Sequence, residues 1–324
     1  MKKYISIILL FIVCLTTNAE TKLTAKNKLY ERGYNFWLYE PDYDTISFNS
    51  KNDSLQLLPQ PIPFDSLSAE EIIAQELMAN NQNALSPFQS TEPRKKPLII
   101  FLHGRSLCGN NLNKVLRYGT IDAVKGGRKI DAFIIAPQNP GTFWEPDKIM
   151  AIADWACENY PIDNNRIYVL GMSLGGYGTI DLVATHPNRI AAAMALCGGG
   201  SRKDLSGLNE VPLWIIHGTA DRAVSVNESR KVRNQMKEAG ETPLLRYDEW
   251  AGINHGALAR LFYLENTYEW LFKHTLDNRT VDKSISITQS DTKNAYKGFK
   301  HRSSSKNKSK AKKKSKRNST KKSN

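Results

Sequence analysis

The segment 171–175 reads Gly-Met-Ser-Leu-Gly, which has the G-x-S-x-G spacing found around nucleophilic serines. An apolar run of strand length, residues 166–170, precedes it, and apolar residues recur at helical spacing from Gly175 onward. A serine at such a strand-to-helix turn is forced into strained backbone angles, so the residues two positions away must be small. Gly171 and Gly175 meet that need. The pattern predicts that Ser173 is a nucleophile at the carboxyl end of a strand.

A serine hydroxyl needs a base that takes its proton and an acid that orients the base. Asp221 lies in the loop after the apolar run 211–216, and His255 lies in the loop after the run 243–247. The chain order Ser, Asp, His is the one used with this kind of nucleophile turn. Because these loops leave the same edge of a parallel sheet, we predict a triad of Ser173, His255 and Asp221.

Each of these positions also has a plain structural explanation when it is taken alone. An aspartate after a strand is commonly a turn residue or a helix cap, and a loop histidine needs no catalytic role. Among the six histidines, His255 alone combines a place after a predicted strand with a place after the acid. His103 and His217 each end a predicted strand before a glycine, where we expect structural hydrogen bonds between loops. The combined order of the three residues favours the catalytic interpretation.

Acyl transfer also needs hydrogen-bond donors aimed at the oxygen that becomes negatively charged. The backbone N–H groups of Leu174, after the nucleophile, and of Arg105, after an earlier predicted strand, are the expected oxyanion-hole donors. The alternative for Arg105 is that Gly104 only turns the chain and Arg105 faces solvent. Trp144 follows the predicted strand 131–136, so we expect it to line a substrate pocket, with core packing as an equal alternative.

The elements that must position these residues alternate along the chain. Apolar runs of strand length alternate with segments of helical apolar spacing, which predicts an α/β fold. The expected architecture is a doubly wound, mainly parallel sheet with helices on both faces, in a catalytic domain over 28–276. An aromatic run at 30–40 adds a strand. The other predicted strands are 97–102, 131–136, 166–170, 190–196, 211–216 and 243–247, and the predicted helices are 148–159, 175–185, 225–239 and 257–276.

The first 19 residues have the features of a secretory signal peptide. Lys2 and Lys3 precede an apolar stretch over 5–15, and small residues follow it, with Ala19 last. We therefore expect export to the periplasm, the cell envelope or the extracellular space. The alternative is a retained membrane anchor, but the apolar stretch is well short of the roughly 20 residues that span a bilayer.

Two other segments stand apart from the predicted domain pattern. Residues 41–96 have little apolar periodicity and are expected to form an insertion or lid-like segment. Residues 278–324 are expected to be a disordered, lysine-rich tail. Of the 45 Lys and Arg residues, 14 lie in 293–324, where there is no Asp or Glu; 31 basic and 32 acidic residues remain elsewhere. The net charge of +13 therefore belongs to the tail.

Such a basic tail predicts attachment to an acidic cell-envelope polymer or a lipid surface. Nucleic acid is a further alternative partner, and a solvated extension without a specific partner is another. After removal of the signal peptide the chain keeps Cys108, Cys157 and Cys197, with no metal-ligand spacing. We therefore expect no metal site and three buried cysteines, with one disulfide and a free thiol as the alternative.

The sequence resembles secreted esterases and predicted peptidases of the α/β-hydrolase superfamily, including polyhydroxybutyrate depolymerase-like, feruloyl esterase-like and acetylxylan esterase-like proteins. The resemblance covers 98–272. Two departures are a longer segment over 43–94 and the lysine-rich tail. The motifs that carry the resemblance are Phe101-Leu102-His103-Gly104, Ala136-Pro137-Gln138, Arg166-Ile167-Tyr168 leading into the serine turn, Leu196-Cys197-Gly198-Gly199, His217-Gly218 with Asp221, and Gly252 with His255.

The resemblance implies an α/β-hydrolase fold, a triad at Ser173, Asp221 and His255, and no metal or organic cofactor. It also implies action on small-molecule, polyester or polysaccharide-linked esters. The leading hypothesis is thus an exported serine hydrolase that cleaves carboxylic esters through an acyl-enzyme. A serine peptidase of the same fold is the alternative within enzymes. An inactive hydrolase-like binding module anchored by the basic tail is the alternative from another class.

Overall fold

The computed structural model describes residues 22–27, 33–42, 94–280, 283–297 and 299. The chain divides into one unit made of residues 1–41 and 96–324 and a second unit of residues 42–95. The predicted signal peptide, nearly all of the predicted insertion and the lysine-rich run after residue 299 lie outside the described residues, so these three expectations stay predictions. No helix in the described part of the chain is both long and apolar enough to span a bilayer.

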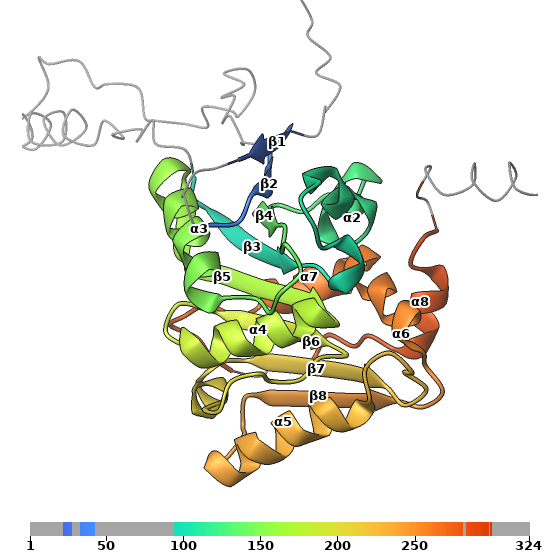
Figure 1. The fold of residues 1–324 in the computed structure, drawn as a ribbon. Coiled ribbons are helices and arrows are strands. Elements are labelled where there is room, and N and C mark those ends of the chain that lie inside the picture. Colours follow the sequence, from blue (N-terminus) through green and yellow to red (C-terminus); the bar gives the residue numbers. More distant parts are fainter. Residues whose placement is uncertain (1–21, 28–32, 43–93, 281–282, 298, 300–324) are drawn as a thin grey trace, which may run out of the picture. The chain divides into compact units, whose positions relative to one another are not determined.

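An eight-stranded sheet forms the centre of the first unit (Figure 1). Its order is β1-β2-β4-β3-β5-β6-β7-β8, with β2 antiparallel to both neighbours and every other pair parallel. All seven residues of β3 are buried, as expected for a parallel strand covered on both faces. The strands are β1 (Lys22–Lys26), β2 (Phe36–Glu40), β3 (Lys96–Leu102), β4 (Phe133–Pro137), β5 (Ile162–Met172), β6 (Ala192–Leu196), β7 (Leu213–Gly218) and β8 (Leu245–Trp250).

Helices cover both faces of this sheet, which confirms the predicted doubly wound α/β-hydrolase architecture. Helices α3, α4 and α5 lie in front of the sheet in Figure 1, and α7 lies behind it. On the α7 side the rings of Trp270 and Trp214 pack edge to face with centroids 5.1 Å apart. The helices are α2 (Thr120–Lys125), α3 (Pro146–Asn159), α4 (Leu174–Thr185), α5 (Val226–Ala239), α6 (His255–Leu258), α7 (Glu265–Phe272) and α8 (Gln289–Asn294).

The predicted helix over 257–276 is divided in the structure. Helix α6 is followed by a short 3-10 helix, Ala259–Tyr263, and the chain is extended at Leu264 before α7 begins. Leu261, Phe262 and Tyr263 are all buried, so the apolar spacing continues through the break and gives no sign of it. Helix α2 was not predicted, because its six residues are too few for a periodic signal.

Both predicted boundaries of the catalytic domain differ from the structure. Strand β1 pairs with β2 and lies before the predicted start at residue 28. At the other end, Ile287 and Ala295 are buried, and Tyr263 packs against the rings of Tyr296 and Phe299, at 4.7 and 5.6 Å between centroids. Residue 278, the predicted start of the disordered tail, is therefore too early in the chain. The apolar residues of this segment stand singly among polar ones, so no periodicity marks their packing.

Truncation tests this boundary. We expect a chain that ends at residue 302 to keep the free energy of unfolding of the full chain within about 0.5 kcal/mol. A chain that ends at residue 280 loses the packing of Ile287, Tyr296 and Phe299 and should be less stable by on the order of 5 kcal/mol. Urea unfolding followed by tryptophan fluorescence measures both. Equal stability of the two truncated chains would contradict the assignment of this segment to the folded body.

Candidate active site

Ser173 occupies a sharp turn between β5 and α4. Its backbone angles are φ 59° and ψ −123°, and Cys197 (φ 39°) is the other described residue besides glycine with a positive φ. The Ser173 N–H donates to the Leu196 carbonyl at 2.9 Å, and the Tyr177 N–H donates to the Ser173 carbonyl at 3.0 Å. These two hydrogen bonds hold an unfavourable backbone conformation that presents the serine side chain beyond the strand.

The two glycines of the turn are required by close backbone contacts. A Cβ atom at Gly175 would overlap the Leu102 carbonyl oxygen, and one at Gly171 would overlap the Gly175 carbonyl oxygen. Backbone atoms cannot move aside as the end of a flexible side chain can. Strand β3 and the start of α4 can therefore approach each other only because these positions lack side chains.

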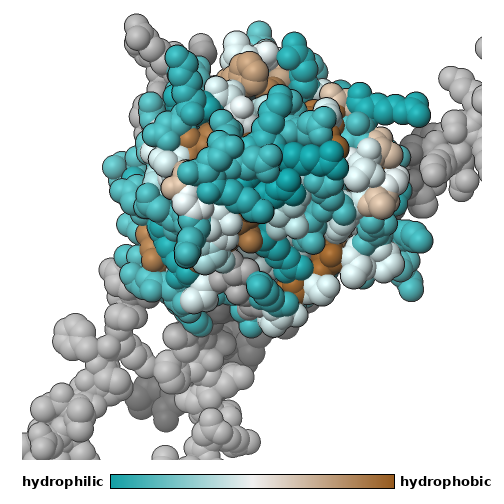
Figure 2. Space-filling view, turned by 90° about the horizontal axis from the view of Figure 1, so that it is seen from below, coloured by the Kyte–Doolittle hydropathy of each residue, from teal (hydrophilic) through white to brown (hydrophobic). Residues whose placement is uncertain are grey.

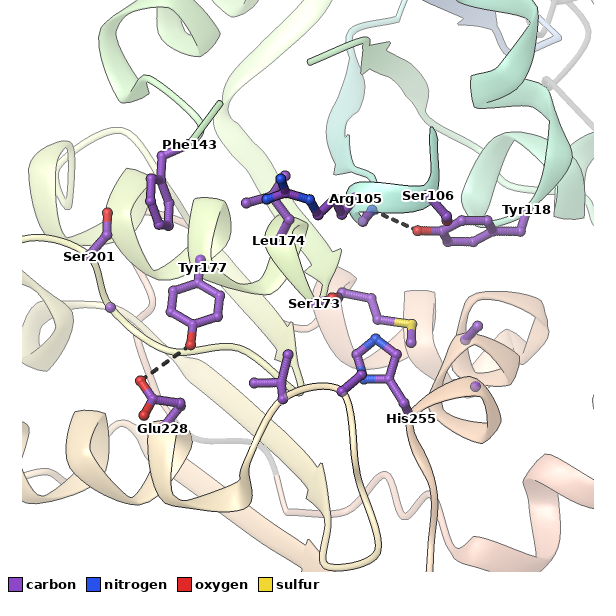
Figure 3. Close-up of a pocket in the computed structure, with 17 residues that line it drawn as sticks. Arg105, Ser106, Tyr118, Phe143, Ser173, Leu174, Tyr177, Ser201, Glu228 and His255 are labelled. Carbon is purple, nitrogen blue, oxygen red and sulfur yellow. Dashed lines mark hydrogen bonds between the residues drawn. The ribbon is translucent and has the colours of Figure 1, made fainter. Parts of the chain in front are cut away.

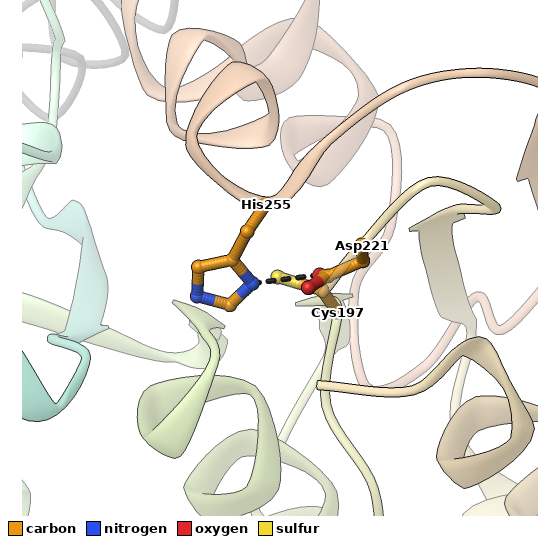
Figure 4. A group of neighbouring side chains, drawn as sticks. All are labelled: Cys197, Asp221 and His255. Atoms are coloured by element: carbon orange, nitrogen blue, oxygen red, sulfur yellow. Dashed lines mark hydrogen bonds and ion pairs between the residues drawn. The ribbon is translucent and has the colours of Figure 1, made fainter. Parts of the chain in front are cut away.

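Asp221 and His255 come together from the loops after β7 and β8. The His255 Nδ1–H donates to Asp221 Oδ2 at 2.6 Å (Figure 4). The other carboxylate oxygen accepts the N–H groups of Ala223 and Val224 at 2.8 and 2.9 Å. The side chain of Asp221 is fully buried, whereas that of His255 is 25% exposed. The aspartate is thus fixed from both sides, and the remaining imidazole nitrogen, Nε2, is left for other partners.

Hydrogen bonds keep the buried Asp221 carboxyl ionised. Burial alone would raise the pKa of Asp221, but the Val224 N–H, the His255 ring and the Ala223 N–H together lower it below its ordinary value. A carboxylate that stays negative near neutral pH can orient the histidine and stabilise it when it is protonated.

The histidines at the ends of β3 and β7 bind neighbouring loops, as predicted. His103 Nε2 accepts the Asn139 N–H at 3.0 Å, and its Nδ1–H donates to the Gly104 carbonyl at 2.8 Å. Burial lowers the pKa of His103 to about 4, so the ring is neutral at pH 7. His217 is also buried, and its ring nitrogens bond the Ser229 hydroxyl and the Val224 carbonyl. Neither ring lines the cavity described next.

Ser173 and His255 line one cavity of about 820 Å³ (Figure 3). The Ser173 hydroxyl makes no hydrogen bond with any other described residue, so it is free to turn about χ1. Arg105 and Leu174 also line the cavity, and neither backbone N–H has an acceptor among the described residues. The structure therefore brings five of the six predicted site residues together: Ser173, Asp221, His255, Arg105 and Leu174 are at or beside this cavity.

Trp144 is the predicted site residue that the structure does not bring to the cavity wall. It is 3% exposed and packs edge to face on Tyr34 and His103, with centroids 5.1 and 5.0 Å apart. Its ring also fills the space that a side chain at Gly178 would need. Core packing, the alternative explanation, is therefore correct, and the neighbouring Phe143 lines the cavity instead.

Several residues of the cavity wall were not predicted. Phe143 is 58% exposed and packs edge to face on Tyr177, and the Tyr177 hydroxyl donates to Glu228 at 3.3 Å. Tyr118 lines the opposite side of the cavity (Figure 3). Tyr177 lies in the first turns of α4, directly after the serine turn, but its role in the cavity wall was not predicted. Phe143, Tyr118 and Glu228 belong to segments without a recognisable motif, and only the fold brings them next to Ser173.

A third side chain, Cys197, completes a cluster with Asp221 and His255 (Figure 4). Each of the three offers an atom of a kind that binds metals, and these atoms lie within 4.8 Å of one another. A thiolate would be required for metal binding, but burial and then the Asp221 charge raise the pKa of the Cys197 thiol well above its ordinary value. His255 Nδ1 is already used by Asp221. The cluster therefore fits a hydrogen-bond network better than a metal site.

Cys108 and Cys157 are free and only half-buried, so the expectation of three buried cysteines is correct for Cys197 alone.

Two sequence comparisons agree with this arrangement. The model of the prolyl oligopeptidase family (Peptidase_S9) matches residues 141–199, which include the serine turn. Acetylxylan esterase A of Emericella nidulans is 26% identical over 155 residues, which cover 42% of this chain and 49% of the esterase. The chain thus spans about half the length of this relative.

Among solved structures, a thermostable esterase is 28% identical with a TM-score of 0.48, covering 58% of this chain and 57% of that one. The fluorophosphonate-binding serine hydrolase FphF of Staphylococcus aureus is 15% identical with a TM-score of 0.47, covering 75% and 97%. The sheet topology and the serine turn, with the two sequence matches, support an esterase- or peptidase-like protein of the α/β-hydrolase superfamily.

The neutral, buried His103 makes stability depend on pH. Its pKa is about 4 in the folded chain against 6.5 ordinarily, so the unfolded chain binds the extra proton as pH falls below 6.5. The stabilisation from the neutral His103 ring is complete above pH 6.5 and is lost towards pH 4. For a pKa shift of this size the free energy of unfolding falls by about 3 kcal/mol. Urea unfolding between pH 7 and 4.5 should show this loss. The His103→Gln variant should be less stable at pH 7 and show a flatter profile, and an equally steep profile would contradict the assignment.

Proposed function

We propose that this protein hydrolyses carboxylic esters through an acyl-enzyme, with Ser173 as nucleophile, His255 as general base and Asp221 as the orienting acid. The observation that carries the proposal is the 2.6 Å hydrogen bond between His255 and the buried Asp221, at a cavity that also holds the strained Ser173. The His255–Asp221 hydrogen bond alone, or the strained serine turn alone, has a structural explanation. Together they supply a nucleophile and an oriented base.

In the first step the Ser173 Oγ attacks the acyl carbon while its proton passes to His255 Nε2. The imidazolium that forms keeps its Nδ1–H bond to Asp221, whose negative charge stabilises it. The carbonyl electron pair moves to oxygen, where the N–H groups of Leu174 and Arg105 are the proposed donors. Collapse of this intermediate expels the alcohol, which takes the proton from His255. Water then enters, and the same residues release the acid.

The far side of the cavity supports an ester whose alcohol or acyl part carries a ring with hydroxyl groups. Phe143 and Tyr177 offer aromatic surface, and Glu228 and Ser201 offer polar atoms beside it (Figure 3). An apolar platform with a few fixed polar groups can bind the faces of a sugar ring and orient its hydroxyls. A carbohydrate-linked acyl ester is therefore the proposed substrate, and the acetylxylan esterase relative supports it.

Hydrolysis of a panel of aryl and sugar esters tests the proposal, with short peptide amides assayed in parallel. We expect ester turnover with a burst of alcohol release. Ser173→Ala should lower kcat/KM by on the order of 10⁴-fold or more, because the nucleophile is lost. Asp221→Asn should lower kcat by about 10⁴-fold, because the histidine loses its orientation and its counter-charge.

A fluorophosphonate probe provides the control, since it should label the wild-type chain once and leave Ser173→Ala unlabelled. Thermal unfolding should show that both variants remain folded. Turnover by Ser173→Ala at the wild-type rate would overturn the nucleophile assignment. Faster cleavage of peptides than of esters would favour the peptidase alternative, to which the Peptidase_S9 match points. A wild-type chain that neither labels nor turns over would favour the inactive binding module.

We also propose that the chain is exported and that its lysine-rich end binds an acidic surface. The support is the signal-like segment 1–19 and the 14 basic residues over 293–324, where acidic residues are absent. The described body has a mostly hydrophilic face with scattered apolar side chains (Figure 2) and offers no comparable anchor on that face.

Vesicle sedimentation tests the surface attachment. The full chain should bind vesicles that contain an anionic lipid at low salt and release them at about 0.5 M salt, because screening weakens charge attraction. The chain that ends at residue 302 lacks most of the basic residues of the tail and should not bind the vesicles. Equal binding by both chains would overturn the role of the tail, and tighter binding to DNA than to vesicles would favour a nucleic-acid partner.

A further inference from the structure

Tyr118 has no part in the chemistry proposed so far, yet its side chain lines the cavity beside Ser173. It follows the 3-10 helix Leu112–Arg117 and precedes Gly119, whose φ of 91° turns the chain into α2. The ring packs edge to face on Phe101, with centroids 6.2 Å apart. The phenol is therefore held in place by core contacts, while its hydroxyl reaches the edge of the sheet where Ser173 lies (Figure 3).

The Tyr118 hydroxyl and the Ser173 side chain face the same small space. A Cβ atom built on Gly104 would lie 2.9 Å from Tyr118 Oη and 3.4 Å from Ser173 Cβ. The Tyr118 hydroxyl and the Ser173 side chain thus border the position that a Cβ atom of residue 104 would occupy. This position stays open because residue 104 is a glycine. The next residue, Arg105, supplies a proposed oxyanion donor at the same place. The acyl oxygen of a substrate attacked by Ser173 must lie close to this space.

The hydrogen bonds of Tyr118 leave its proton available to the cavity. The Gly104 N–H donates to Tyr118 Oη at 2.6 Å, so the hydroxyl oxygen acts as an acceptor toward the protein. A phenol has one O–H, and no backbone group among the described residues accepts it, so the proton can point to the cavity or to the Ser106 hydroxyl. The Ser106 hydroxyl is its other polar neighbour and also lines the cavity.

We propose that Tyr118 O–H is a third donor in the oxyanion hole, acting with the Leu174 and Arg105 N–H groups. This inference rests on the proposed ester hydrolysis at Ser173. When Ser173 Oγ bonds to the acyl carbon and its proton moves to His255, the carbonyl electron pair becomes a negative oxygen. Tyr118 donates a hydrogen bond to that oxygen and keeps its proton. The bond weakens when the carbonyl reforms and the alcohol leaves with the proton from His255.

The ionisation of the phenol agrees with this role. Burial raises the pKa of Tyr118 to about 12, although the Gly104 N–H and the Ser106 hydroxyl act in the opposite direction. The group therefore remains a protonated donor at any pH at which esters are assayed. A neutral donor placed beforehand in a partly buried site stabilises developing charge more than it stabilises the neutral substrate.

The Tyr118→Phe variant tests the proposal on the best ester from the panel. We expect kcat to fall by roughly 10²-fold with KM within about threefold, because the lost bond forms mainly in the transition state. A trifluoromethyl ketone analogue of that ester, which forms a tetrahedral oxyanion with serine, should bind weaker by a similar factor. Fluorophosphonate titration should still give one site per chain, which shows that Ser173 and His255 remain functional.

A second variant and a control separate catalysis from structure. 4-Aminophenylalanine at position 118 keeps an N–H donor at the same place and should recover at least about tenfold of the lost kcat; it also serves if the phenylalanine variant does not fold. Tyr268→Phe removes another buried hydroxyl, which donates to the Phe262 carbonyl at 2.5 Å away from the cavity, and should change stability without changing kcat. Unchanged kcat and ketone affinity in Tyr118→Phe would overturn the role of Tyr118 alone. Absent labelling in the wild-type chain would instead overturn the proposed function.

Discussion

The geometry of the site depends on how closely the backbone at the end of β5 approaches its neighbours. Ser173 has a left-handed conformation, which costs on the order of 1–3 kcal/mol for a residue with a side chain. Hydrogen bonds to Leu196 and from Tyr177 maintain it, and the absence of side chains at Gly171 and Gly175 lets β3 lie against the turn. Because β5 is an inner strand with buried neighbours on both sides, its end cannot relax. The same approach that strains Ser173 brings the loop after β3, with the proposed oxyanion donor Arg105, to the edge of the cavity.

Neutral, buried histidines extend this rigidity to the surrounding loops. His103 joins the loop after β3 to Asn139 in the loop after β4, and His217 joins the end of β7 to the Val224 carbonyl. Neither ring needs a charge for these bonds, and burial favours the neutral form of both. The loops after β7 and β8 are further tied by the Ala220 N–H bond to the Ile253 carbonyl. Asp221 and His255 are consequently placed by hydrogen bonds between loops, while Ser173 is placed by the sheet itself.

The sequence allowed prediction of those parts of the site that follow directly from strands. Ser173, Asp221 and His255 each come soon after an apolar run. Because the carboxyl ends of parallel strands lie at one edge of a sheet, the sequence alone predicts that the three residues lie close together. Trp144 was misplaced because the end of a strand gives the edge on which a loop lies and not the direction of each side chain. The buried Trp144 directly follows the exposed Phe143 in the chain. Tyr118 could not be predicted, since its position depends on a short 3-10 helix and on the turn at Gly119. The packed segment with Ile287 and Phe299 was missed for a similar reason, because its contacts are made by single residues in a polar sequence.

The two sides of the cavity differ in chemistry, and this difference bears on how an ester would lie in it. Near Tyr118 and Arg105 the wall offers hydrogen-bond donors, which suit the acyl oxygen. On the other side of Ser173, the Phe143–Tyr177 pair and the Glu228 carboxylate, which also bonds Lys231, offer aromatic surface and acceptors. A negative oxygen is disfavoured beside Glu228 and favoured beside the donors, so charge alone orients the carbonyl. The ring-bearing part of the proposed ester would then lie on the aromatic side, where its hydroxyl groups can donate to the carboxylate. The loops that carry the proposed donors would thus also orient the proposed ester.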